Sequence, residues 1–465
     1  MTPTVRLGVT GLSRSGKTVL ITGLVETLTN RSADPSYARL AGIPGLRAYL
    51  EPQPDDDVPR FQYEEHSSAL AGTPPAWPES TRRISQLRLT LEWESSETWR
   101  QWLGMPARLH VDIVDYPGEW LIDLAMMGQS FAEWSEAALT LARSPALSPH
   151  ARPFLQFLAD VGATAAADEQ VAIAGASLFT SYLAEARRRA PAEAALGPGR
   201  FLLPGDLEGS PQLTFFPLGD AARAAEQPRT LASLLARRYD SYRANVVEPF
   251  FRAHFARLDR QIVLVDALGA LNGGAEALAN LERGLAGVLA AFRPGRQSWL
   301  SFITPRRVGR IVFAATKADH VHRSSHPRLQ AILEKAVARA ARRASTAGAG
   351  VRCIALAALR ATEDVEKVTG SETYRCVRGI PLPGQAVAGR AFDGRKPAVV
   401  FPGDLPADPL DAFEPTSARP EHYNFVRFMP PERSVQPWSA GGAARVWPHV
   451  GLDEIITFLL GDHLP

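Results

Sequence analysis

The feature that most constrains this chain is a phosphate-binding loop close to its N-terminus. Residues 11–18 have the sequence GLSRSGKT, which fits the pattern G-x-x-x-x-G-K-[ST]. The apolar run Val5–Thr10 predicts a buried strand before the loop, and the apolar periodicity of residues 17–28 predicts a helix after it. A strand, a glycine-containing loop and a helix in this order are the context that the motif requires. An ordinary strand–turn–helix is the alternative.

The residue types of this loop suit a nucleotide. Glycines let backbone N–H groups turn inward around phosphate oxygens, and the following helix offers its positive N-terminal end. We expect Lys17 to reach the β and γ phosphates and the Thr18 hydroxyl to bind Mg²⁺. Arg14 could bring a guanidinium to the transition state, or it could be a solvent-facing loop residue. The nucleotide contacts predicted for this loop are Gly11, Ser13, Arg14, Ser15, Gly16, Lys17, Thr18 and Val19.

A second motif, DYPG, follows a predicted strand pair. Alternating polar and apolar residues over 84–93 and 108–115 predict two half-buried strands, and the linker of about a dozen residues favours antiparallel neighbours. Asp115 at the strand end could hold the Mg²⁺ water shell, while the N–H group of Gly118 could contact the γ-phosphate. Glu119 could orient the attacking water, or it could be a surface residue at a helix start. A plain turn at the strand end is the alternative for DYPG.

The metal also needs a switch residue ahead of the first of these two strands. Residues 31–80 look irregular, with room for one short helix, and Thr81 lies at their end. Its hydroxyl could bind Mg²⁺ and its N–H group could contact the γ-phosphate, which would make Thr81 catalytic as well as metal-binding. Thr73 is the rival for this role, and a simple cap or loop threonine is the third reading.

A third motif, TKAD, follows the predicted strand 310–315. In [NT]KxD motifs the aspartate, here Asp319, pairs with the N1 and N2 hydrogens of guanine, and the lysine stem, here that of Lys317, lies over the base plane. Adenine presents no such donors, so a buried carboxylate of this kind rejects it. Thr316 opens the motif, and Ala357, Ala358 and Leu359 after the next strand resemble the loop whose N–H groups contact guanine O6. A helix cap is the alternative reading of TKAD.

One further carboxylate ends a predicted strand. Asp266 closes the segment QIVLVD, which should lie beside the first strand, so its side chain should face the crevice at the carboxyl edge of the sheet. A role toward a water molecule or the metal, and a helix cap, are the two readings that we retain.

The order of strands and helices predicts an α/β fold with a mixed, mostly parallel sheet covered on both faces. With 465 residues, the chain is too long for one ordinary core. We therefore divide it into a P-loop core, a large helical insertion rich in alanine, leucine and arginine, and a smaller loop-rich C-terminal insertion with short strands. The predicted ranges are 1–119, 259–365 and 446–465 for the core, 120–258 for the helical insertion and 366–445 for the second insertion.

Several stretches of the chain are distinctive, namely GLSRSGKT, WPEST before a strand, DYPGEW, LVDALGALNGG, TKADHVH and the C-terminal PHVGLDEIITFLLGDHL. Taken together, they resemble the YcjX-like family of bacterial P-loop proteins. The resemblance spans nearly the whole chain, although the helical insertion contributes few distinctive residues. Such a resemblance implies a Ras-like GTPase core with an additional helical domain, and a stress-associated cytosolic role.

The leading hypothesis is therefore a Mg²⁺-dependent GTPase switch that binds GTP and GDP. An ATPase or small-molecule kinase sharing only the phosphate loop, and a nucleotide-loaded scaffold without hydrolysis, are the alternatives. The helical insertion could bind a protein partner. A formal net charge of +2 gives no indication of nucleic acid, and two distant cysteines suit a reducing cytoplasm. No transmembrane segment or signal peptide is expected, and peripheral membrane contact is left open.

Overall fold

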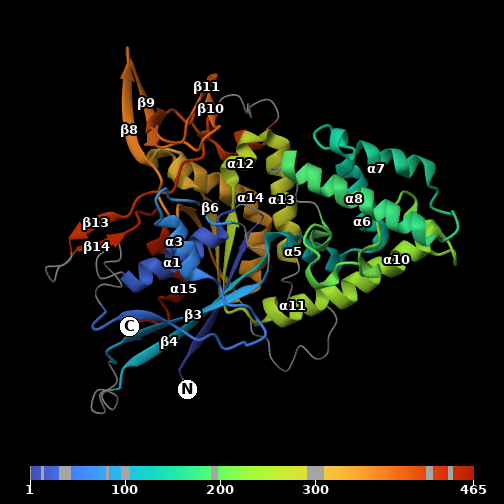
Figure 1. The fold of residues 1–465 in the computed structure, drawn as a ribbon, viewed down its shortest axis with the longest axis horizontal. Helices are drawn as coiled ribbons and strands as arrows, with labels where there is room; N and C mark the ends of the chain where they lie inside the picture. Colours follow the sequence, from blue (N-terminus) through green and yellow to red (C-terminus); the bar gives the residue numbers. More distant parts are fainter. Residues whose placement is uncertain are drawn as a thin grey trace. The chain divides into compact units, whose positions relative to one another are not determined.

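The computed structural model describes residues 2–11, 15–30, 43–79, 83–95, 105–189, 197–290, 308–414, 423–437 and 443–465. The chain forms two compact units (Figure 1). The first contains residues 1–117, 258–274 and 306–465, and the second contains 118–257 and 275–305. Whether the predicted core and insertions are separate domains stays a prediction. None of the helices within the described residues combines the length and the apolar character that a membrane span requires.

The first unit is built on a seven-stranded sheet in the order β2-β3-β4-β1-β5-β6-β7. The strands are β1 (Thr4–Gly11), β2 (Arg47–Glu51), β3 (Ser85–Trp93), β4 (Ala107–Asp115), β5 (Arg260–Val265), β6 (Arg310–Thr316) and β7 (Gly350–Leu356). Strands β4, β1, β5, β6 and β7 run parallel, whereas β3 is antiparallel to both β4 and β2. The predicted mixed, mostly parallel sheet is thus confirmed, including the antiparallel pair β3–β4. The edge strand β2 lies in the stretch that we expected to be irregular.

Helices cover both faces of this sheet. They are α1 (Lys17–Asn30), α3 (Tyr63–Leu70), α12 (Ala267–Asn272), α14 (His326–Thr346) and α15 (Leu452–Leu460). The apolar residues of α1 and α15 form one core with alternate residues of the strands, among them Leu7, Val111 and Val312. Side chains alternate across a strand, so Ile311 and Phe313 point to the opposite face, where α12 and α14 pack against β6.

The C-terminal part of the first unit consists of small antiparallel sheets. A three-stranded sheet has the order β12-β9-β8, and two hairpins pair β10 with β11 and β13 with β14. The bounds are β8 (Glu363–Thr369), β9 (Glu372–Gly379), β10 (Ala386–Val387), β11 (Arg390–Ala391), β12 (Ala398–Val400), β13 (Ser434–Pro437) and β14 (Ala443–Val446). Val377, Val400, Val426 and Phe428 form a small core there. The short strands expected for 366–445 are present, and β8 begins slightly before that range.

The second unit is helical. Its helices are α5 (Gly118–Asp123), α6 (Phe131–Ala142), α7 (Ser148–Asp160), α8 (Glu169–Arg189), α9 (Ala221–Ala225), α10 (Leu231–Tyr242), α11 (Glu248–His254) and α13 (Gly274–Ala290). Aromatic side chains fill its core, with Trp134 packing against Phe179, Phe215 and Tyr239 at centroid distances of 5.2–6.0 Å. Such rings bury a large apolar area and prefer the tilted and edge-on arrangements seen here.

A buried carboxylate ties α5 to the rest of the second unit. Asp123 is 3% exposed and accepts hydrogen bonds from the Tyr242 hydroxyl at 2.6 Å and from the Gly199 N–H group at 2.5 Å. Trp120, one turn earlier, lies 3.3 Å from the Arg200 guanidinium. Burial raises the pKa of Asp123 to about 6, although Tyr242 and the backbone N–H groups of Gly199 and Arg200 favour the ionised form.

This shift predicts a pH dependence of stability. The folded protein keeps the Asp123 proton at pH values where the unfolded chain, with a pKa of 3.8, releases it. The contribution of Asp123 therefore falls as the pH rises from about 4 to about 6 and is level above that range. We expect Asp123→Asn, a neutral isostere, to flatten this slope and to raise the free energy of unfolding at pH 7.5 by up to about 3 kcal/mol.

Chemical unfolding at pH 5.0 and pH 7.5 measures this effect. The other titratable groups at Asp123 are Arg200, whose pKa burial lowers, and Tyr242, whose pKa burial raises well above its usual value, so that Tyr242 stays neutral. Asp206→Asn is the control, because that side chain is 88% exposed. The expectation would be contradicted if Asp123→Asn lowered the free energy of unfolding, relative to wild type, by the same amount at both pH values.

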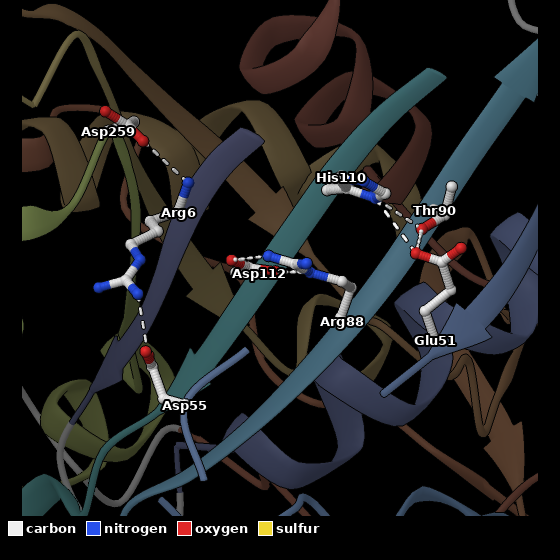
Figure 2. A network of polar contacts seen from close by, with 8 residues as sticks. All are labelled: Arg6, Glu51, Asp55, Arg88, Thr90, His110, Asp112 and Asp259. Carbon is white, nitrogen blue, oxygen red and sulfur yellow. Dashed lines mark hydrogen bonds and ion pairs between the residues drawn. The ribbon is translucent and has the colours of Figure 1, made fainter. Parts of the chain in front are cut away.

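One face of the sheet is polar along β1, β4, β3 and β2 (Figure 2). Arg88 holds Asp112 through two hydrogen bonds of 2.6 and 2.8 Å, and Arg6 binds Asp55 at 2.9 Å. Thr90 joins Glu51 and His110, with 2.8 Å to each. Asp112, to which the sequence assigns no role, is thus a 1% exposed partner of an arginine on the neighbouring strand. A two-pronged arginine contact of this kind compensates for burial of the carboxylate.

Candidate nucleotide-binding site

The phosphate loop joins β1 to α1 in the first unit. Gly11 has φ +154°, and a Cβ there would lie 2.5 Å from Ser15 Oγ and 2.8 Å from the Leu264 carbonyl oxygen, so only glycine fits. Gly16 has φ +90°, which also favours glycine. Lys17 Nζ donates to the Gly11 carbonyl at 3.0 Å, so the lysine folds back over the loop. Ser13 and Arg14 lie outside the described residues.

Thr18, at the start of α1, lies beside the segment that leads to β3. Its Oγ1 atom is 3.5 Å from the carbonyl oxygen of Glu79. Thr81, the switch residue chosen from the sequence, lies outside the described residues, two positions after Glu79. The rival Thr73 lies farther back along the same loop and is exposed. The contact brings Glu79 to the hydroxyl proposed for the metal.

Asp115 ends β4 at the same edge of the sheet. It is 1% exposed and lies in register with Val9 of β1 and Ser85 of β3. The chain continues through Tyr116, which is fully buried and whose pKa burial raises, to Gly118, the first residue of α5. Glu119 belongs to α5, and its side chain lies outside the described part. Its role in orienting water stays a prediction.

The TKAD residues follow β6. Lys317 adopts a left-handed backbone with φ +62°, and Asp319 is 5% exposed. Asp319 Oδ2 accepts a 2.8 Å hydrogen bond from the Ala361 N–H group, and the Thr362 hydroxyl donates to the Asp319 carbonyl. These bonds fix the aspartate to the loop after β7, which is the loop that the sequence associates with guanine O6. The other oxygen of Asp319 is not used by either bond.

The loop with Ala357, Ala358 and Leu359 packs against α1. A Cβ on Gly23 of α1 would lie 3.1 Å from the Ala358 carbonyl oxygen, so the two backbones approach closely. Leu359 shares an apolar cluster with Val19, directly after the phosphate loop, and with Leu70, Trp77 and Trp447. Phosphate-loop residues and base-loop residues, although far apart in the sequence, therefore belong to one packed region.

Asp266 is in contact with the TKAD lysine. Its Oδ1 atom accepts a 3.0 Å hydrogen bond from the Gly269 N–H group and so caps α12. Its other oxygen forms an ion pair with Lys317 Nζ. Asp266 is thus a helix cap, which was one of the two roles expected from the sequence, and it also contacts Lys317, which the sequence did not suggest.

Sequence reasoning missed a connection between the segment before β3 and the C-terminal sheets. Trp77 Nε1 donates to the Phe428 carbonyl at 2.7 Å, and the Phe428 ring packs edge-on against His320, directly after Asp319, at 5.5 Å. Arg433 binds the buried Glu26 of α1 at 2.9 Å. Residues 423–433 thus link the base motif, α1 and the segment that leads to Thr81. No motif marks this stretch, so no sequence signal could have found it.

Comparison with known proteins found a family model and similar sequences over nearly the whole chain. The family model described as "YcjX-like family, DUF463" matches residues 5–464. A Shewanella oneidensis protein named "Ras-like GTPase YcjX" is 34% identical over 99% of this chain and 94% of its own length. An Escherichia coli K12 protein with the same name is also 34% identical, over 99% of this chain and 96% of its own length. The similarity thus covers both compact units.

Proposed function

The chain belongs to the YcjX-like family, and from that premise we propose that it is a Mg²⁺-dependent GTPase that switches between GTP and GDP states. The names of its relatives support a GTPase-like function with guanine-nucleotide binding. One observation carries the finer proposal. The phosphate loop, Asp115, TKAD and the loop after β7 follow β1, β4, β6 and β7, which run parallel and so end at one edge of the sheet. Ligands of open α/β sheets bind at this edge.

The proposed reaction is in-line attack of water on the γ-phosphorus, with GDP and phosphate as products. Lys17 and the loop N–H groups stabilise negative charge on the β and γ phosphate oxygens. The guanidinium group of Arg14 stabilises the same negative charge in the transition state. Gly118 and Thr81 contact the γ-phosphate, so their segments relax once it has left. Glu119 orients the water molecule. The buried Asp319 selects guanine, while the Lys317 stem lies over the base.

The residues proposed for the metal fit Mg²⁺ in their chemistry. Thr18 and Thr81 would bring hydroxyl oxygens and Asp115 a carboxylate, and Mg²⁺ prefers such hard oxygen ligands together with water. The approach of Glu79 to Thr18 supports this set, because Thr81 is two residues away. When bound, the ion would neutralise charge between the β and γ phosphates.

The cellular setting belongs to the same proposal. A stress-associated, cytoplasmic role is what the resemblance to the family implies. A protein partner of the helical unit would give the switch an output, since α5 begins at Gly118 and is held in that unit through Asp123. Nucleic acid is not proposed as a partner, because the formal net charge is only +2.

A calorimetric titration with GTP, GDP and ATP, each with and without Mg²⁺, tests the proposal. We expect guanine nucleotides to bind at least about a hundredfold more tightly than ATP, because Asp319 rejects adenine. GTP should also bind more tightly with Mg²⁺ than with EDTA. Equal or ATP-favoured binding would remove the base-reading role of TKAD and favour the ATPase or kinase alternative.

A further inference from the structure

The Asp266–Lys317 contact connects the ends of two neighbouring strands. Val265 of β5 is in register with Ala315 of β6, so Asp266 and Lys317 both lie just beyond the sheet at the edge proposed for the nucleotide. The Thr316 hydroxyl donates to the Val265 carbonyl at 3.3 Å and holds the two strand ends together. Lys317 Nζ then reaches across to the carboxylate of Asp266.

The local backbone orients both side chains of the pair. Asp266 has one oxygen bound to the Gly269 N–H group, which leaves its second oxygen pointing to the lysine. Lys317 has a left-handed backbone, which few non-glycine residues adopt, and this sets the direction in which its side chain leaves the strand. The Asp266 and Lys317 side chains are 31% and 28% exposed, so the contact is partly open to solvent and does not lie in the core.

We propose that Asp266 is a positioning residue for guanine-nucleotide binding. Its ion pair with Lys317 holds the lysine stem in the position from which it would lie over the base plane. This inference rests on the proposed function. A free lysine side chain loses much rotational freedom when it is ordered against a ligand. With its ammonium group already bound to Asp266, the stem is ordered before the base arrives, and the binding affinity is higher for that reason.

Asp266 also caps α12, and this second role has to be separated from the first. Asparagine caps helices about as well as aspartate, so Asp266→Asn keeps an oxygen for the Gly269 N–H group. It removes the negative charge that Lys317 contacts. Asp266→Asn therefore isolates the lysine-holding role, whereas Asp266→Ala removes both roles.

The experiment is a double-mutant cycle of GDP affinity, measured by calorimetry on the full chain. Its members are the wild type, Asp266→Asn, Lys317→Met and the double variant, with Asp266→Ala alongside. We expect Asp266→Asn to weaken GDP binding by about tenfold, which corresponds to about 1.4 kcal/mol. In the Lys317→Met background the same substitution should have no further effect, because the lysine through which it acts is gone. A purely structural role would weaken binding equally in both backgrounds.

Asp408→Asn is the matched control, since Asp408 caps the short helix Pro409–Phe413 through the Leu410 N–H group at 2.8 Å. It should leave GDP affinity unchanged. Three results for Asp266→Asn would overturn the inference. Its GDP affinity could equal that of the wild type, or exceed it because the pair holds the lysine away from the base. Alternatively, the substitution could weaken GDP binding equally in the wild-type and Lys317→Met backgrounds. Wild-type protein that binds ADP as tightly as GDP would instead overturn the proposed function, and this inference with it.

Discussion

Replacing Lys17 with alanine is expected to lower GTP turnover by about a thousandfold, the upper range for loss of one preorganised charge-stabilising group. Lys17 is 6% exposed, and its ammonium group donates to the Gly11 carbonyl of the phosphate loop at 3.0 Å. In the proposed mechanism, a positive charge at this position would stabilise the negative charge that develops on the β and γ phosphates as GDP leaves. Release of phosphate from saturating GTP, followed over time, measures the effect.

Lys335→Ala is the control for this substitution, because Lys335 is an exposed residue of α14 and its loss should leave turnover unchanged. Unfolding temperatures of both variants show whether each is folded. Undiminished turnover in Lys17→Ala would rule out the proposed mechanism. Wild-type turnover that is no higher than that of Lys17→Ala, combined with tight nucleotide binding, would favour the scaffold without hydrolysis.

The strands of the main sheet could be predicted from the sequence because their local pattern is strong. Apolar runs such as RIVFAA and VRCIAL, and the alternation before Asp115, match β6, β7 and β4 within one or two residues. Strand β2 was missed because RAYLE carries little apolar signal. All its residues are intermediate or exposed, and it is held at the sheet edge by pairing with β3. Tertiary pairing and not local preference decides such a strand.

The candidate site was predictable where the chemistry is local. Gly11 and Gly16 could be chosen from the motif, and their positive φ angles explain why glycine stands there. The pairing of Asp266 with Lys317 could not be predicted, because it depends on β5 lying beside β6 and on the second oxygen left by the α12 cap. The sequence predicts the segment QIVLVD beside the first strand and does not indicate its second neighbour, β6, on which this contact depends.

The same reasoning explains why the C-terminal contribution was missed. The sequence indicates short strands in 366–445 but not what they touch. Phe428 reaches the neighbourhood of Asp319 through His320, while its carbonyl binds Trp77. One segment thus contacts both the base motif and the loop that leads to Thr81. Both contacts join parts of the chain that are far apart in the sequence, which is why no local pattern indicates them.

Replacing Asp319 with asparagine is expected to lower the preference for GDP over ADP by about a hundredfold or more. This is the typical effect of losing charge-assisted hydrogen bonds in a buried site. Asparagine keeps an oxygen for the 2.8 Å bond from the Ala361 N–H group, so the loop should stay in place. Its amide group, however, presents donors where guanine N1 and N2 also present donors. Calorimetric titration of the variant with GDP and ADP measures the loss.

Asp364→Asn is the matched control, because the carboxylate of Asp364 accepts from the Arg323 N–H group at 2.9 Å and from Arg360 at 2.7 Å. It should leave the GDP preference intact. If Asp319→Asn also kept that preference, the carboxylate would serve only to hold the loop after β7, and base selection would have to come from other groups. If Asp319→Asn lost the preference for GDP and Asp364→Asn kept it, the buried Asp319 would be the residue that reads guanine. The loop after β7 should have the same geometry in wild type and in Asp319→Asn, because asparagine keeps the bond from the Ala361 N–H group.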